Sequence, residues 1–235
     1  MKLKALTLAL GLGVFAFSSC DKKVDTNMAL NTTVDSVSYS IGASFGGNLL
    51  QNSLEEINQD ALLAGLNAAL AQEDLRIEPR AGGAIINKFI KELKTKAAEK
   101  NKVAGEKFLE ENKAKEGIVT TESGLQYKVL TEGKGEIPTK DQQVKVHYRG
   151  TTIDGKEFDS SYKRNEPATF LPTRVIKGWT EALQLMPVGS KWELYIPSDL
   201  AYGARGAGAN IGPNSTLIFE VELLDIVKEE APAKK

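Results

Sequence analysis

The sequence contains one histidine, His147, and one cysteine, Cys20, and these two counts limit its chemistry. A structural zinc site needs about four nitrogen or sulfur ligands, so no such metal site is expected. A disulfide framework is excluded because it needs pairs of cysteines. A histidine-based catalytic triad could use only His147. Most metal sites are therefore not expected, and any activity must operate without a cysteine–histidine pair.

The overall charge argues against nucleic acid as a partner. The chain has 30 basic and 31 acidic residues and a formal net charge of −1. Such a balance supplies no basic field for a phosphate backbone. The glycines between Gly203 and Gly212 superficially resemble a phosphate-binding loop, but they follow no strand-to-helix turn and lack the lysine. We expect neither a nucleic-acid nor a nucleotide site.

The first twenty residues have the features of an export signal. Lys2 and Lys4 precede an apolar run of about 13 residues, which is too short to span a bilayer. Residues 17–20 resemble the bacterial lipobox, which implies removal of residues 1–19 and attachment of lipid to Cys20. The expected location is the bacterial cell envelope, with the protein anchored by lipid, at the outer membrane facing the periplasm or the cell surface. The alternative is an ordinary secretory signal with an incidental cysteine.

Residues 20–33 are polar and lack periodicity, which predicts a flexible tether, and residues 34–80 show helical periodicity. Apolar residues recur at three- and four-residue steps in two runs: Val34, Val37, Ile41 and Phe45, then Leu62, Leu63, Leu66 and Leu70. Asn58 or Asp60 could cap the second helix. Because two small helices bury little area alone, we expect another chain or another segment to pack against them.

A long connecting helix is predicted over residues 81–116, with Pro79 suited to its first turn. Its apolar stripe of Ile85, Phe89 and Leu93 fades after Ala97. Residues 91–116 then include eight lysines and six glutamates. This pattern predicts a helix of roughly 50 Å that is packed at its start and solvated later, with a possible kink at Gly105. A spacer is the expected role, and a binding surface is the alternative.

From residue 117 the pattern changes to the alternation typical of strands. Turn residues separate the alternating segments, and one helical piece interrupts them near Lys177 to Met186. The predicted fold class is α+β: an all-α amino-terminal domain, the long helix, and over residues 117–228 an antiparallel sheet curled around one short helix. Residues 229–235 are charged and are expected to form a disordered tail.

Five stretches of the β region carry a family resemblance: residues 146–150, 154–161, 175–179, 197–203 and 211–219. Together they resemble the FKBP-type peptidyl-prolyl cis-trans isomerases. Residues 167–170 and 179–187 are similar to the Mip-like subgroup, the macrophage infectivity potentiators. That subgroup also carries a helical dimerisation domain and a long connecting helix. Together with the apolar stripes of residues 34–93, this resemblance implies a homodimer.

The chemistry implied by this resemblance is rotation about the bond before proline, which costs about 18–20 kcal/mol because amide resonance resists twisting. A site must favour the twisted amide over the planar forms. A dry aromatic cup can do so, since the less delocalised twisted carbonyl loses less on leaving water. No cofactor and no titrating group are needed. The implied substrates are proline-containing polypeptides, and macrolide ligands of the family could also bind.

The resemblance also implies roles for individual residues. Trp179 is the expected floor of the cup, with walls formed by Tyr148, Phe158, Val175, Ile176 and Phe219. The Tyr202 hydroxyl and the Ile176 amide would donate hydrogen bonds to substrate carbonyls. Asp159 is expected at the rim, polarised by a tyrosine and by Arg164, and Ile211 in a flap over the site.

Each of these assignments has a simpler alternative. Aromatic residues at alternating strand positions are more often core than ligand contacts, and we expect Val146, Phe170 and Trp192 to be core. His147 is expected at the surface without a role. For the whole protein, the alternatives to the enzyme are a non-catalytic chaperone or binding module for proline-containing chains, and a structural lipoprotein. If the domains are modular, removal of residues 34–115 should leave the rate on short peptides nearly intact.

Overall fold

The structure, a computed structural model, describes residues 26–51, 54 and 56–227. The predicted signal, Cys20 and the predicted tail after residue 228 lie outside these residues. The chain divides into two compact units, and the first unit ends within the first helix at Ser44. Among the described residues, no helix combines the length and the apolar character needed to cross a membrane.

Two helices follow one another near the amino terminus, as predicted. Helix α1 spans Thr33–Gln51 and α2 spans Gln59–Leu70. A reciprocal cap begins α1, because Thr32 Oγ1 accepts from the Asp35 amide and Asp35 Oδ2 accepts from the Thr32 amide. Asn58 caps α2 by accepting from the Ala61 amide at 3.0 Å. Neither helix contains a buried residue, so their apolar side chains are available to a partner.

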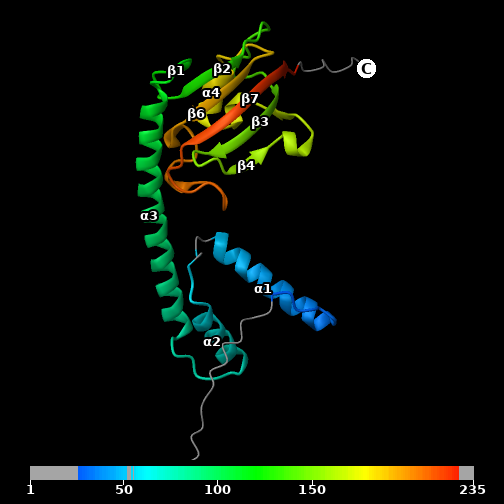
Figure 1. The fold of residues 1–235 in the computed structure, drawn as a ribbon, viewed down its shortest axis with the longest axis vertical. Coiled ribbons are helices and arrows are strands. Elements are labelled where there is room, and N and C mark those ends of the chain that lie inside the picture. Colours follow the sequence, from blue (N-terminus) through cyan, green and yellow to red (C-terminus); the bar gives the residue numbers. More distant parts are fainter. Residues whose placement is uncertain (1–25, 52–53, 55, 228–235) are drawn as a thin grey trace, which may run out of the picture. The chain divides into compact units, whose positions relative to one another are not determined.

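Helix α3 spans Pro79–Asn112 and begins with proline in its first turn, as expected (Figure 1). Ile85, Ile86 and Phe89 near its start are exposed. Its buried residues are Gly105 and Asn112, in the half that the charge pattern predicted to be solvated. The prediction that the later half of this helix is solvated was therefore wrong, whereas packing of its start against a second copy stays a prediction.

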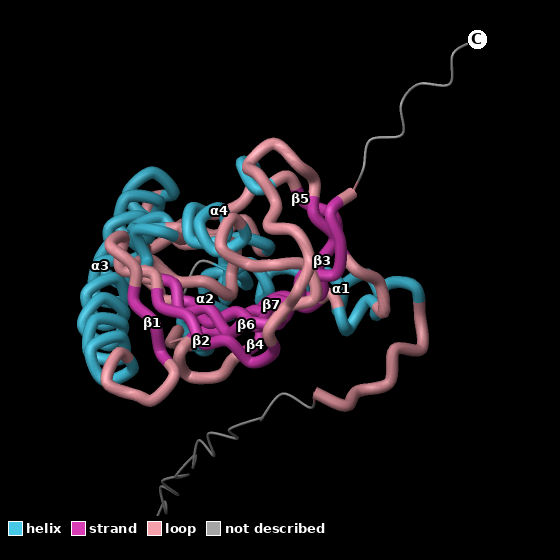
Figure 2. The backbone as a smooth tube through the Cα atoms, turned by 90° about the horizontal axis from the view of Figure 1, so that it is seen from above, coloured by secondary structure: helices cyan, strands magenta, loops and turns pink. Residues whose placement is uncertain are grey.

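The sheet domain consists of strands joined in one antiparallel sheet. The strands are β1 (Ile118–Thr120), β2 (Gln126–Thr131), β3 (Val144–Thr152), β4 (Glu157–Ser160), β5 (Ala168–Phe170), β6 (Lys191–Ile196) and β7 (Leu217–Ile226). Their order is β1-β2-β6-β7-β3-β4, with β5 also paired to β3. Figure 2 shows β1 at the edge nearest α3 and β5 beside β3. This arrangement confirms the predicted fold class.

The short helix α4 (Lys177–Leu183) packs against the sheet and closes the core. It approaches closely because Gly178 has no side chain: a Cβ there would lie 2.5 Å from Ile196 Cγ2. Val146 and Trp192 are buried in this core, as predicted, and Trp192 stacks on Tyr127 with ring centroids 4.2 Å apart. The same core supports the residues of the site described below.

The carboxyl-terminal half of α3 is attached to the sheet domain by polar and small residues. Asn112 is buried and donates to Gln126 Oε1 at 3.0 Å, and Gln126 donates in turn to the Leu109 carbonyl at 2.8 Å. The Phe108 ring lies 6.0 Å from that of Tyr195. Because few of these contacts involve aliphatic side chains, hydrophobic periodicity could not predict them.

Candidate functional site

A cavity of about 440 Å³ opens on the sheet domain between β3, β4, α4 and the segment after β6. Most of the side chains around it are aromatic or aliphatic. The lining residues are Tyr148, Phe158, Asp159, Phe170, Arg174, Val175, Ile176, Trp179, Tyr202 and Phe219. The cavity is therefore an apolar cup with a few polar groups, which is the usual composition of a small-ligand site.

Trp179 lies at the centre of the aromatic side chains and is only 3% exposed. Its ring meets those of Tyr148, Phe170 and Phe219 edge to face, with centroids 5.3, 5.6 and 5.3 Å apart and interplanar angles of 87°, 85° and 82°. Edge-to-face packing of this kind fixes the rings relative to one another. The Trp179 Nε1 atom is buried and has no hydrogen-bond partner within the described residues. The rings thus form an apolar floor and wall whose mutual orientation is fixed by packing.

Gly150 on β3 allows two of the rings to meet. A Cβ at this position would lie 2.6 Å from Phe158 Cζ and 2.7 Å from Phe219 Cε1. Phe158 and Phe219 meet edge to face, with centroids 5.4 Å apart. Any side chain at residue 150 would displace one or both rings, so the shape of the cup depends on this glycine.

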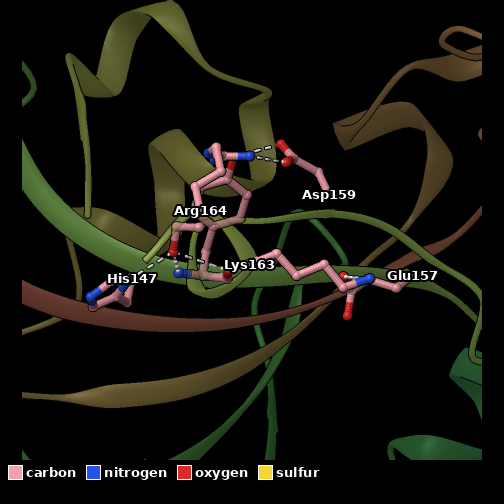
Figure 3. A network of polar contacts seen from close by, with 7 residues as sticks. His147, Glu157, Asp159, Lys163 and Arg164 are labelled. Atoms are coloured by element: carbon pink, nitrogen blue, oxygen red, sulfur yellow. Dashed lines mark hydrogen bonds and ion pairs between the residues drawn. The ribbon is translucent and has the colours of Figure 1, made fainter. Parts of the chain in front are cut away.

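A triangle of polar contacts borders the cup (Figure 3). The Tyr148 hydroxyl donates to Asp159 Oδ2 at 2.5 Å, and Arg164 donates to Asp159 Oδ1 at 2.6 Å and to the Tyr148 hydroxyl at 2.9 Å. Burial alone would raise the pKa of Asp159, but the hydrogen bonds from Tyr148 and Arg164 outweigh it, so this pKa lies below its ordinary value. Burial, followed by the hydrogen bond to Asp159, raises the pKa of Tyr148. Near neutral pH the triangle therefore consists of a carboxylate, a guanidinium and a neutral phenol.

Ser161 holds the backbone of Tyr148 in place. Its hydroxyl oxygen accepts from the Tyr148 amide at 2.8 Å and lies 3.2 Å from the Tyr148 carbonyl, to which it can donate. The same oxygen is 2.9 Å from His147 Nδ1, and the His147 ring stacks on Tyr162 at 4.7 Å. His147 is therefore half-buried and has partners, whereas the sequence predicted an ordinary surface histidine. It does not line the cup.

Two further polar groups lie at the cup. The Tyr202 side chain lines it and is 40% exposed. Burial, with a smaller contribution from the charge of Asp159, raises the pKa of Tyr202, so its hydroxyl keeps its proton near neutral pH. Ile176 precedes α4, and its carbonyl accepts from the amides of Trp179 and Thr180. Within the described residues, the Ile176 amide itself makes no hydrogen bond.

The structure brings most of the predicted site residues together. Eight of them line the cup: Tyr148, Phe158, Asp159, Val175, Ile176, Trp179, Tyr202 and Phe219. Arg164 contacts the cup through Tyr148 and Asp159. Ile211 does not line it; it is buried in the following loop, where it pairs with Ala207.

Two lining residues were missed by sequence reasoning. Phe170 was predicted to be core, yet it is only partly buried and forms a wall next to Trp179. Alternation cannot distinguish these outcomes, because the inner face of a sheet lines both the core and any cavity within it. Arg174 had no signal of its own. Only its position immediately before Val175 and Ile176 could have suggested it.

Comparison with known proteins identifies the family. Residues 134–224 match the family described as "FKBP-type peptidyl-prolyl cis-trans isomerase", and residues 34–129 match the "Domain amino terminal to FKBP-type peptidyl-prolyl isomerase". "Outer membrane protein MIP" of Legionella longbeachae is 44% identical over 97% of this chain and 99% of its own length. The chain belongs to the FKBP-type peptidyl-prolyl cis-trans isomerases. The resemblance found in the sequence is thus confirmed.

Other FKBP-type proteins match at similar levels. The "FKBP-type 22 kDa peptidyl-prolyl cis-trans isomerase" of Escherichia coli strain K12 is 46% identical, covering 86% of this chain and 100% of that protein. The crystal structure of FkpA from Escherichia coli aligns with a TM-score of 0.63 at 37% identity, covering 84% of this chain and 98% of that one. These matches extend over both the helical region and the FKBP domain, and they support the assignment of this chain as an isomerase.

Proposed function

We propose that the cup around Trp179 is where this FKBP-type isomerase accelerates rotation about X–Pro bonds. The observation that carries the proposal is the ring cluster, in which Trp179 is buried against three other aromatic side chains beside an open cavity. A proline ring can occupy this apolar floor. The planar amide before it has the larger dipole and loses more on leaving water, so the cup favours the twisted form.

Two donors orient the peptide on either side of the rotating bond. We assign the Tyr202 hydroxyl and the Ile176 amide as hydrogen-bond donors to two separate carbonyls of the substrate. Both groups keep their protons near neutral pH, so they bind the carbonyls without transferring a proton. Fixing both ends lets the bond between them turn while the flanking chain stays in place. In this scheme the protein needs neither a nucleophile nor a cofactor.

Asp159 contributes a fixed negative charge at the rim. A planar amide carries more negative charge on its carbonyl oxygen than a twisted amide, so a carboxylate near that oxygen destabilises the planar state more. Tyr148 and Arg164 hold the carboxylate in position. The charge therefore acts by its position and not as a base.

The direct test is a protease-free isomerase assay on a proline tetrapeptide, with wild type compared with Trp179→Ala. We expect the variant to lose most of the acceleration. Folding must be checked by circular dichroism, since truncating a buried tryptophan costs about 3–5 kcal/mol. A folded Trp179→Ala protein with the wild-type rate would refute the site. Inhibition of the wild type by a macrolide ligand of the family would support it independently.

We also infer that the protein works in the cell envelope, attached through lipid on Cys20. The inference is supported by the apolar run and the lipobox-like residues 17–20, and by the relative named "Outer membrane protein MIP", which aligns along nearly its whole length. Metabolic labelling with a radioactive fatty acid tests it. Label should enter the wild type and be absent from Cys20→Ser, and label retained by that variant would contradict the inference.

The helical region is proposed to pair with a second copy. Val34, Ile41 and Phe45 of α1 are 72%, 66% and 50% exposed, and Leu66 and Leu70 of α2 are 52% and 75% exposed. Apolar side chains exposed on neighbouring turns form a patch that is typical of a protein–protein interface. Light scattering at micromolar concentration should give twice the chain mass, and a monomer would reject the dimer. A dimer would present two cups to one unfolded client, which favours an additional chaperone role.

A further inference from the structure

We propose that Asn101 and Gly105 of α3 are positioning residues, which hold the loop that follows Tyr202 and thereby adjust the isomerase site. The loop comprises residues 203–216, between Tyr202 and β7. The inference rests on the proposed role of Tyr202. The sequence indicates that α3 is a spacer, and this inference gives the helix a second role in shaping the cup.

The loop is tied to itself and to the residue after Tyr202. The Asn214 amide donates to the Gly203 carbonyl at 2.8 Å, and Ala207 pairs with Ile211 through both amides at 2.8 and 3.1 Å. The Ser215 hydroxyl donates to the Gly212 carbonyl at 2.9 Å. These bonds make residues 203–216 a compact unit. A displacement of Asn214 is therefore transmitted to Gly203, which is bonded directly to Tyr202.

Helix α3 holds that unit through side chains on one face. Asn101 Nδ2 donates to the Pro213 carbonyl at 2.9 Å and lies 3.4 Å from Ser215 Oγ. In the opposite direction, Asn214 Nδ2 donates to the Ala98 carbonyl at 3.4 Å. Two side chains thus cross the same gap, and Asn214 also bonds to the residue that follows Tyr202. The connection from Asn101 to Tyr202 is a continuous series of bonds.

Gly105 lets the helix come this close. It is buried, and a Cβ at this position would overlap the Thr216 hydroxyl oxygen and lie 3.1 Å from Thr216 Cβ. Thr216 is only 4% exposed and directly precedes β7, which carries the wall residue Phe219. The requirement for glycine here is therefore close packing and not a kink. Moving α3 outward would break the hydrogen bond from Asn101 to the loop and would remove the contact of Gly105 with Thr216 at the start of β7.

The test compares two glycine-to-alanine substitutions in the full-length protein. Both Gly105→Ala and Gly83→Ala favour the helix, but nothing lies within 4 Å of a Cβ at Gly83. Helix propensity therefore cannot account for a difference between them. We expect Gly105→Ala to lower kcat/KM by between about three- and tenfold, less than the roughly hundredfold that a 1 Å misplacement can cost. Gly83→Ala should match wild type.

Rescue distinguishes a contact from general damage. Thr216→Ala removes the hydroxyl that the new Cβ would overlap, so the double variant Gly105→Ala/Thr216→Ala should recover most of the lost activity. Amide hydrogen exchange should increase at Gly206, Ala207 and Asn214 in Gly105→Ala and return toward wild type in the double variant. Asn101→Asp, which keeps the shape but removes the donor to Pro213, should produce the same increase in the loop.

The two readouts separate this inference from the proposed function. A wild-type protein without isomerase activity would overturn the proposed function, whereas the exchange data would still test the positioning. Unchanged exchange and unchanged kcat/KM in Gly105→Ala and Asn101→Asp would overturn the positioning. Faster loop exchange with an unchanged rate would also overturn it, because the loop would then move without affecting catalysis.

Discussion

The Tyr148 hydroxyl donates a 2.5 Å hydrogen bond to Asp159 across the paired strands β3 and β4. The phenol proton of Tyr148 is therefore used in a hydrogen bond within the protein, and Arg164 contacts both groups. Among the tyrosines that line the cup, Tyr202 is the one left to bind a substrate carbonyl. The relationship thus divides the two tyrosines into one that orients a carboxylate and one that is free to contact the peptide in the proposed site.

Tyr202→Phe should reduce kcat/KM by between about two- and tenfold. A single neutral hydrogen bond contributes about 0.5–1.5 kcal/mol, and about 1.4 kcal/mol corresponds to tenfold in rate. The half-exposed side chain should leave the unfolding free energy nearly unchanged. Tyr195→Phe is the matched control, because it removes a hydroxyl that bonds to Glu193 away from the cup. Equal rates for the two variants would contradict the role of Tyr202.

Asp159→Leu should lower kcat/KM by about tenfold or more, because it removes the rim charge and releases Tyr148 and Arg164. The unfolding free energy should change by no more than about 1 kcal/mol, since the Asp159 and Arg164 side chains are 43% and 51% exposed and solvent screens their pairing. Kinetics and urea titration of the same preparation measure both effects. Glu157→Gln is the control: it removes a carboxylate from the same strand, where it pairs with Lys163 outside the cup (Figure 3). An activity loss shared by both variants would argue against a specific rim charge.

Trp179→Phe and Trp192→Phe form a pair that separates packing from function. Both indole nitrogens are buried without a partner among the described residues, so neither substitution removes a hydrogen bond. We expect comparable losses of stability, of about 1–3 kcal/mol, from the smaller ring. Only Trp179→Phe should alter the KM for a proline tetrapeptide. A similar change of KM in Trp192→Phe would indicate that the effect comes from the core.

Isomerase activity should be independent of pH between about pH 5 and about pH 9. The pKa of Asp159 is lowered from its ordinary value of 3.8, and the pKa values of Tyr148 and Tyr202 are raised above their ordinary value of 10.0. For the lowered Asp159, the stabilisation it contributes is complete above its unfolded pKa and is lost as pH falls through the folded value. A pH profile of kcat/KM checks this expectation. A step between pH 6 and pH 8 would show that a titrating group takes part.

The sequence predicted the fold and most of the cup because the relevant signals are local. Each signal can be recognised within a few residues: strand alternation, the Asn58 cap, the Pro79 helix start and the aromatic blocks. Phe170 was misassigned because core and cavity wall occupy the same face of a sheet. The role of Ser161 in holding Tyr148 also had no local signal, since it depends on the β3–β4 pairing.

The docking of α3 was missed for a different physical reason. Its contacts use Gly105, Asn101 and Asn112, which add nothing to a hydrophobic stripe, and the lysines and glutamates between them indicate a solvated helix. The structure also changes one expectation. Removal of residues 34–115 would delete these contacts, so we now expect it to impair the rate on short peptides.

The chain has two tryptophans, and they differ in what surrounds them. Trp192 stacks on Tyr127 in the core, while Trp179 forms the floor of the cup. In Trp192→Phe, the intrinsic tryptophan fluorescence would therefore come from Trp179, which a proline ring would cover in the proposed site. The protein carries its own optical reporter, and titration of peptides or macrolides could be followed without attaching a dye.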